Sequence, residues 1–214
     1  MTSSHGAAQD ATSRLAELEH GTTAAAALEL FDSLPALGTD EMLGRWAGRG
    51  VPTAHPFDGM LEALGWYGKR MDSPDDVHPL VFRGAHARLV AITPTLLPLG
   101  PALRLAPVVP PAVAARVFAV LRPLLTTSRP QARLRTVTYR GVASAAMVYD
   151  RLPIIDAFRR VDGRTVLGVM DVRGSAVPYV FVLRRDRAPR PAESSFGRVH
   201  GSRPGASSAT ATRS

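Results

Sequence analysis

Six charged side chains in the second half of the chain form its densest cluster of groups that could do chemistry. They are the carboxylates Asp150, Asp156 and Asp171 and the guanidinium groups of Arg140, Arg159 and Arg160. A carboxyl group placed in an apolar interior has a raised pKa and can transfer protons. We therefore take Asp156 and Asp171 as candidate catalytic residues. The alternatives are that they orient a ligand, form structural ion pairs or face solvent.

This cluster lies where apolar and polar residues alternate, a pattern typical of β-strands. Gly141 and the Asp162-Gly163 pair separate the runs at hairpin spacing. The predicted strands cover residues 134–140, 143–149, 154–161, 165–173 and 179–184. Three more are predicted around Trp46, 79–83 and 88–93, giving about eight strands, enough to close a barrel around side chains or one small ligand.

Three helices are expected before and within this sheet, over residues 24–34, 58–71 and 112–125. Thr22 or Thr23 caps the first, and Asp58 caps the second. Pro110 and Pro111 open the third in the favoured first-turn position. The predicted fold class is therefore α+β and mainly antiparallel β: a barrel of about eight strands with N-terminal and inserted helices.

A barrel of this size often encloses an apolar pocket with few polar groups. Large apolar and aromatic side chains on the predicted strands would line such a pocket, and the carboxylates would hold the polar end of a ligand. The candidate ligand-binding residues are Tyr139, Met147, Tyr149, Asp156, Phe158, Met170, Asp171, Tyr179 and Phe181, with Ile155 as a further wall residue. The pattern leaves open which face of each strand lines the interior.

Composition excludes several classes of protein. The chain of 214 residues has no cysteine, so disulfides and thiolate metal sites are impossible. It lacks the dinucleotide-binding glycine fingerprint, the phosphate-binding Gly-Lys-Ser/Thr sequence and the Gly-x-Ser-x-Gly nucleophile elbow. The six histidines are not spaced as metal ligands, so no metal is expected. The identity of any cofactor stays open.

The net charge of +8 is concentrated at the C-terminus. From Arg184 onward there are seven arginines against Asp186 and Glu193, a balance of +5 that leaves +3 for residues 1–183. Lysine occurs only once, at Lys69. Basic residues are not interleaved with aromatic ones, so nucleic acid is not an expected partner. The tail is interpreted as a solvated segment, with attachment to an anionic surface as the alternative.

The chain divides into a disordered segment 1–21, a barrel domain 22–186 and a disordered Arg-rich tail 187–214. Within the domain, 22–93 and the β-meander 131–186 flank a Pro-rich bridge and helix, 94–130. Repeated prolines argue against a membrane span in the apolar stretch 89–125. That stretch could be a lid, a contact with a membrane surface, or a helix packed on the barrel. No secretion signal is recognised, so a cytoplasmic protein is expected.

The segment Gly44-Arg45-Trp46-Ala47-Gly48 resembles the GXWXG family of bacteria and fungi. Ordered blocks downstream resemble the domain of unknown function that usually adjoins it. These blocks include Tyr139-Arg140-Gly141, Met147-Val148-Tyr149-Asp150, Pro153-Ile154-Ile155-Asp156 and Leu167-Gly168-Val169-Met170-Asp171. The resemblance covers residues from about 25 to 186, and it implies an architecture rather than an activity.

The same motif is similar to the Gly-x-Trp sequence of lipocalins, and this resemblance implies a β-barrel of the calycin or lipocalin type. There a tryptophan closes one end of the barrel beneath an arginine of the last strand. The resemblance implies a structural role for Gly44, Trp46 and Gly48 together with Arg184, or with the neighbouring Arg185. An ordinary core position for Trp46 is the alternative.

Three hypotheses about function follow. The first is a binding or carrier protein for a hydrophobic small molecule, such as a fatty acid or lipid, in the barrel. The second is a cofactor-independent isomerase, cyclase or decarboxylase that uses Asp156 or Asp171 as its acid or base. The third is an accessory protein that contacts a surface through its tail. The oligomeric state stays open.

Overall fold

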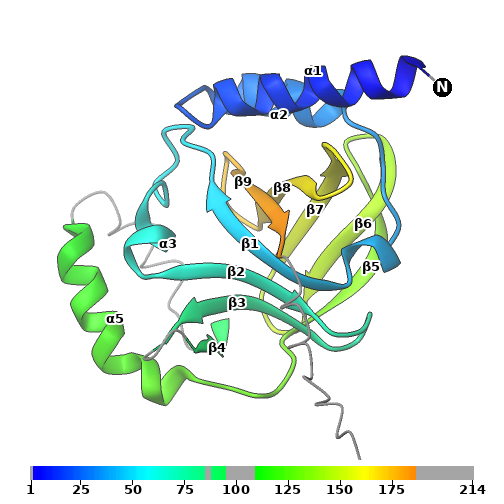
Figure 1. Ribbon diagram of the computed structural model, residues 1–214. Helices are drawn as coiled ribbons and strands as arrows, with labels where there is room; N and C mark the ends of the chain where they lie inside the picture. The colour runs from blue at the N-terminus through cyan, green and yellow to red at the C-terminus, as the bar shows by residue number, and fades with distance from the viewer. Residues whose placement is uncertain (1, 85–87, 95–108, 187–214) are drawn as a thin grey trace, which may run out of the picture.

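The strands form one antiparallel sheet that closes on itself (Figure 1). The computed structural model describes residues 2–84, 88–94 and 109–186. Its strands are β1 (Gly44–Gly50), β2 (Trp66–Met71), β3 (Val77–Arg83), β4 (Leu89–Ala91), β5 (Ala132–Tyr139), β6 (Val142–Tyr149), β7 (Ile154–Arg160), β8 (Thr165–Val172) and β9 (Tyr179–Arg185). They lie in the order β2-β1-β9-β8-β7-β6-β5-β3-β4.

Closure of the barrel depends on β2, which pairs with both β1 and β3. Eight strands form the ring, and β4 attaches to the edge of β3 outside it. The predicted antiparallel barrel of about eight strands is therefore confirmed. The strands that form the ring differ from those predicted, however, because β2 was not expected and β4 is not part of the ring.

Helices pack around this ring. They are α1 (Thr2–Leu18), α2 (Ala24–Ser33), the short 3-10 helix η1 (Asp40–Met42), α3 (Met60–Ala63) and α5 (Pro111–Leu125). Helices α1 and α2 run side by side across one side of the barrel, and α5 lies on another side near β3 and β4 (Figure 1). The cap expected at Thr22 or Thr23, at the start of α2, is present, since the Thr23 hydroxyl accepts a hydrogen bond from the Ala26 amide.

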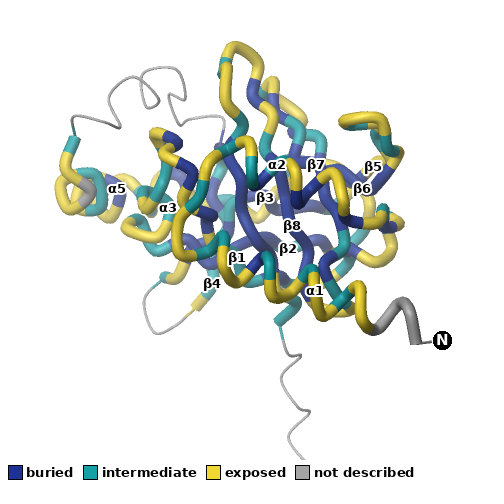
Figure 2. The backbone as a smooth tube through the Cα atoms, turned by 90° about the horizontal axis from the view of Figure 1, so that it is seen from above, coloured by how far each residue is buried: buried dark blue, intermediate teal, exposed yellow. Residues whose placement is uncertain are grey.

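Two layers of buried apolar side chains hold these parts together. One fills the barrel, with Trp46, Phe158 and Phe181 among its members. The other lies between the outer face of β7–β9 and the helices α1 and α2, and it includes Leu15 and Phe31. Figure 2 shows buried residues concentrated along the strands, with the exposed ones on the helices and loops. Strands β7, β8 and β9 are consequently buried on both faces.

The N-terminal segment differs from the expectation of disorder, because most of residues 1–21 forms α1. Tertiary contacts explain the difference. Leu15 is buried against the outer layer, and Glu19 just beyond the helix accepts two hydrogen bonds from Arg184. A weakly amphipathic sequence is thus held by packing on the sheet rather than by its own propensity.

The predicted helix over 58–71 is wrong. Only Met60–Ala63 is helical, and Trp66–Met71 is strand β2. Pairing along both edges of β2 overrides the local helical spacing. The register with β3 shifts on each side of Gly68, which has a φ of 146° and would place a Cβ only 2.0 Å from the Trp46 carbonyl oxygen. This bulge needs glycine.

The Arg-rich tail and most of the Pro-rich bridge lie outside the described residues. Among the helices of the described part, none has the length and apolar character needed to cross a membrane.

Candidate functional site

The barrel interior contains an ion pair between Lys69 and Asp156. The Lys69 ammonium lies 2.7 Å from Oδ2 of Asp156 and also donates to the Pro79 carbonyl oxygen at 3.3 Å. Asp156 is 0% exposed and Lys69 is 3% exposed. Burial of two charges is costly unless they are paired and hydrogen-bonded. The pair is therefore the dominant polar feature of an otherwise apolar space.

Two features of the strands bring these residues together. The bulge at Gly68 interrupts the alternation of β2, so Tyr67 faces outward and Lys69, opposite Trp46 on β1, faces inward. Asp156 lies on β7, which is four strands from β2 in either direction around the ring of eight. The side chains therefore reach each other from opposite walls of the barrel.

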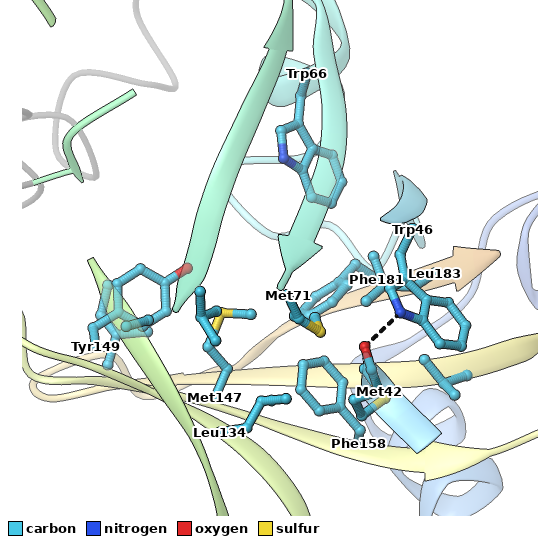
Figure 3. Packing of buried hydrophobic residues seen from close by; sticks show 14 of the residues in the cluster. Met42, Trp46, Trp66, Met71, Leu134, Met147, Tyr149, Phe158, Phe181 and Leu183 are labelled. Atoms are coloured by element: carbon cyan, nitrogen blue, oxygen red, sulfur yellow. Dashed lines mark hydrogen bonds between the residues drawn. The ribbon is translucent and has the colours of Figure 1, made fainter. Parts of the chain in front are cut away.

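Aromatic rings surround the pair. The Tyr149 hydroxyl donates to Oδ2 of Asp156 at 3.3 Å. The Lys69 ammonium lies 5.0 Å from the ring centroid of Phe181 and 5.9 Å from those of Trp66 and Tyr149. Figure 3 shows the side chains of Trp66, Tyr149 and Phe181 among the buried residues of the barrel. Cation–π attraction in such surroundings supplements the ion pair.

Burial changes the protonation of these groups. It raises the pKa of the Asp156 carboxyl, while the Lys69 ammonium acts in the opposite direction. Burial also raises the pKa of the Tyr149 phenol well above its ordinary value. Tyr149 is thus a neutral donor, and Asp156 holds a proton more tightly than an exposed aspartate would. A carboxyl group with a raised pKa can act as an acid or a base toward a bound molecule.

Three buried polar atoms in this interior have no hydrogen-bond partner among the described residues: Oδ1 of Asp156, Nε1 of Trp66 and the hydroxyl of Tyr179. Shared contacts link their residues. Trp66 and Tyr179 both pack against the Phe181 ring, at centroid distances of 6.2 Å. Asp156 and Tyr179 each pair in register with Met170. An acceptor, a donor and a hydroxyl of the barrel residues therefore lack a hydrogen bond within the described part of the chain.

A second polar group adjoins Tyr179. The His55 and Tyr179 rings lie 5.3 Å apart, and the Asp58 carboxylate accepts from the backbone amides of Thr53 and His55. Burial lowers the pKa of His55, so the imidazole is neutral near pH 7. This group fixes the loop before α3 against the barrel.

Comparison with known proteins gives a family and a related structure. The description "GXWXG protein" matches residues 29–86, and "Domain of unknown function (DUF4334)" matches residues 130–185. A crystal structure of a protein from Thermomonospora curvata has 32% sequence identity and a TM-score of 0.62, covering 83% of this chain and 99% of that one. The chain belongs to the GXWXG family. A search of curated proteins found no match.

The GXWXG tryptophan seals one part of the barrel. Its indole donates a hydrogen bond to the Met42 carbonyl oxygen at 2.8 Å, drawn dashed in Figure 3. The guanidinium of Arg185 lies 4.3 Å from the Trp46 ring centroid and donates to the carbonyl oxygens of Leu43 and Glu41. The expected tryptophan–arginine contact of the GXWXG motif is present.

Of the two candidates, Arg185 makes this contact and Arg184 does not. Strand parity is the reason, because Phe181, Leu183 and Arg185 face inward and Arg184 faces outward to pair with Glu19 at 2.7 Å. The second motif glycine, Gly48, packs beneath Trp66, where an added Cβ would lie 2.4 Å from the ring. The motif residues of this GXWXG protein therefore act through packing.

The structure brings together most of the predicted ligand-binding residues. The interior positions are Met147, Tyr149, Asp156, Phe158, Met170, Tyr179 and Phe181. Tyr139 instead packs outside the barrel, with its ring 6.1 Å from that of Phe31 on α2. Asp171 and Ile155 pair with each other on the face opposite to Asp156 and Met170. Asp171 is exposed and lies apart from the interior site, so Asp156 is the remaining carboxyl candidate.

Sequence reasoning missed Lys69 and Trp66, which it placed in a helix. A signal was present for Lys69, since it is the single lysine among 26 basic residues. Lysine carries a compact ammonium group and arginine a planar guanidinium, so this position differs in chemistry from all the other basic ones.

One set of potential metal ligands occurs in the described part of the chain: Asp72, Asp76 and His78, with ligand atoms within 4.8 Å of one another. Asp72 pairs with Arg70 at 2.9 Å, and His78 Nε2 lies 3.1 Å from Oδ1 of Asp76. These contacts lie within the β2–β3 hairpin and its turn.

Proposed function

We propose that this GXWXG protein binds a small, mainly apolar molecule inside the barrel and holds its polar group at Lys69 and Asp156. One observation carries the proposal. A buried ion pair shares the apolar interior with three polar atoms that lack partners among the described residues. A lipid-like compound with a hydroxyl, carbonyl or carboxyl group fits this chemistry.

Energetics favour a ligand over a purely structural ion pair. Leaving a buried donor or acceptor without a partner costs about 1–3 kcal/mol for each group. A structural pair gains from having its remaining lone pairs satisfied, whereas Oδ1 of Asp156 has no partner. A ligand hydroxyl could donate to Oδ1, and a ligand oxygen could accept from the Trp66 indole. Binding would thus remove two of these costs at once.

A second candidate function is proton transfer on the bound molecule. The raised pKa of Asp156 favours it, together with a Lys69 ammonium and a Tyr149 hydroxyl that both contact the carboxylate. In an isomerisation, Asp156 would remove a proton from carbon, Lys69 would stabilise the resulting oxyanion, and Asp156 would return the proton to another carbon. No co-reactant is needed for this cycle.

Native and denaturing mass spectra of the freshly purified protein test the binding proposal. We expect a discrete mass difference that corresponds to a noncovalent small molecule, which can be extracted and identified. The Lys69→Met/Asp156→Leu variant should lose the adduct, because the polar group of the ligand has no partner there. Asp171→Asn is the control, since it removes an outward carboxylate, and it should retain the adduct.

A second set of results would contradict binding of a ligand inside the barrel. If the wild type carries no adduct, and a fatty-acid panel neither binds nor displaces 1-anilinonaphthalene-8-sulfonate, interior binding is contradicted. With the ligand identified, Asp156→Asn separates the two functions. Loss of conversion with retained binding indicates an enzyme, and absence of conversion in the wild type indicates a carrier.

A further inference from the structure

A second polar site lies on the outside of the barrel, on the opposite face of β2 from Lys69. It is a pocket of about 580 Å³ formed by β1, β2, β3 and β4. Four arginines line it: Arg45, Arg70, Arg83 and Arg88. Because these residues face away from the interior, the pocket is independent of the interior ligand site.

The lining carries an excess of positive charge. Against the four guanidinium groups it contains one carboxylate, Asp186, a balance of +3. Asp186 is occupied, since it lies 3.5 Å from Arg45 and accepts a hydrogen bond from the Tyr67 hydroxyl at 2.6 Å. Outside the lining, Asp72 pairs with Arg70. Among the described residues, no ion pair compensates the positive charges of Arg83 and Arg88.

Tyr67 organises the pocket. Burial and the bond to Asp186 raise the pKa of Tyr67 to about 12, so its phenol stays a neutral donor. The Arg83 guanidinium lies 5.2 Å from the Tyr67 ring centroid. A guanidinium stacked on a ring uses its flat face and keeps its N–H edge for an anion. Arg83 is therefore oriented before any ligand arrives.

We propose that this pocket binds a phosphate group. A single carboxylate would be matched by one arginine, whereas several guanidinium groups around one pocket match a multiply charged, polydentate anion. The volume lies within the range of small-molecule sites. Val81 and Leu89 supply an apolar wall for whatever carries the phosphate. The ligand is thus a phosphate monoester with an apolar or aromatic substituent.

The phosphate has two chemical sources, a soluble molecule or an anionic lipid headgroup. The second is relevant because α5 is hydrogen-bonded to β3, a strand that lines the pocket. Arg122 of α5 donates to the Arg83 carbonyl oxygen at 2.9 Å. The same helix exposes apolar side chains, with Val120 76% and Leu124 78% exposed. A helix of this kind, next to a phosphate site, could contact the lipid that carries the headgroup.

Titration calorimetry with phenyl phosphate at low ionic strength tests the soluble source. Sedimentation with vesicles of phosphatidylcholine, with and without phosphatidic acid, tests the lipid source. The test variant is Arg83→Gln/Arg88→Gln. The control is Arg133→Gln/Arg135→Gln, which removes the same charge from β5, outside the pocket. We expect saturable binding that weakens at least tenfold in the test variant and changes less than twofold in the control.

The binding results distinguish a soluble phosphate ligand from a lipid headgroup. Binding of phenyl phosphate assigns a soluble ligand, and binding only to vesicles with phosphatidic acid assigns a lipid headgroup. Binding to neither overturns the proposal. Equal loss in both double variants also overturns it, because net surface charge then explains the binding. If the test variant has a lowered Tm, Arg83→Lys/Arg88→Lys replaces it. That variant keeps the positive charges but not the planar guanidinium groups, which form two parallel hydrogen bonds to an anion. Its affinity should lie between those of the wild type and the Arg83→Gln/Arg88→Gln variant.

Discussion

The Lys69 ammonium and the Asp156 carboxylate meet at 2.7 Å across the barrel, from strands that lie on opposite sides of the ring. Because the two side chains meet inside the barrel, the pair ties opposite walls together. The stability of the fold and the proposed ligand binding therefore depend on the same contact.

Removing one partner of the ion pair should lower the free energy of unfolding more than replacing both partners by apolar residues. Asp156→Leu leaves the buried Lys69 ammonium without its partner, and we expect the unfolding free energy to fall by about 3–5 kcal/mol. Lys69→Met/Asp156→Leu replaces both charges by apolar groups of similar size, so we expect a stability within about 2 kcal/mol of the wild type or above it. Urea unfolding measures both. A double variant as unstable as Asp156→Leu would contradict this account.

The Lys69→Met variant should lose stability as pH rises. Burial raises the pKa of Asp156 above its ordinary value of 3.8, and removal of Lys69 takes away the group that opposes this rise. The folded state then holds the proton more tightly than the unfolded chain. Stability is therefore full below pH 3.8 and is lost as pH rises through the folded pKa, by up to about 1.4 kcal/mol per pH unit.

Urea unfolding over a pH series gives the measurement for this variant. Lys69→Met/Asp156→Leu is the reference, since it lacks the titrating carboxyl but shares all other groups. The difference in unfolding free energy between the two variants should grow with pH. A difference that stays constant from acid to neutral pH would show that Asp156 does not titrate in this way.

Arg185 and Arg184 offer a matched pair for testing the seal over Trp46. Arg185→Gln removes the cation from the ring and two hydrogen bonds to carbonyl oxygens, so we expect a loss of about 1–3 kcal/mol. Arg184→Gln removes an ion pair to Glu19 at the outer surface and should cost less than about 1 kcal/mol. Thermal unfolding of both variants under the same conditions checks the order, which would be reversed if α1 docking dominated.

Gly48 should be intolerant of a side chain. An added Cβ would lie 2.4 Å from the Trp66 ring, which would have to move away from the ion pair. We expect Gly48→Ala to destabilise by about 1–3 kcal/mol through overpacking. At Gly163 an added Cβ meets nothing within 4 Å, so Gly163→Ala should stay within about 0.5 kcal/mol of the wild type. Similar losses at both positions would contradict the close contact.

Much of the barrel is readable from the sequence because its signals are local. Alternation from residue 132 to 185 gives β5–β9, and the Asp162-Gly163 pair marks the turn between β7 and β8. Thr23 marks the start of α2. The GXWXG motif indicates the family and the position of Trp46. Each of these features depends on a few neighbouring residues, so no tertiary contact is needed to recognise it.

The site itself depends on tertiary structure. The helices α1 and α2 cover the outer face of β7–β9, so both faces of these strands are apolar and the sequence does not reveal which face is inside. For this reason Asp156 and Asp171 were equivalent candidates, as were Arg184 and Arg185. Only closure of the ring makes Trp66–Met71 a strand, and only the bulge at Gly68 turns Lys69 inward. The polar centre is thus a product of strand pairing, which no local pattern records.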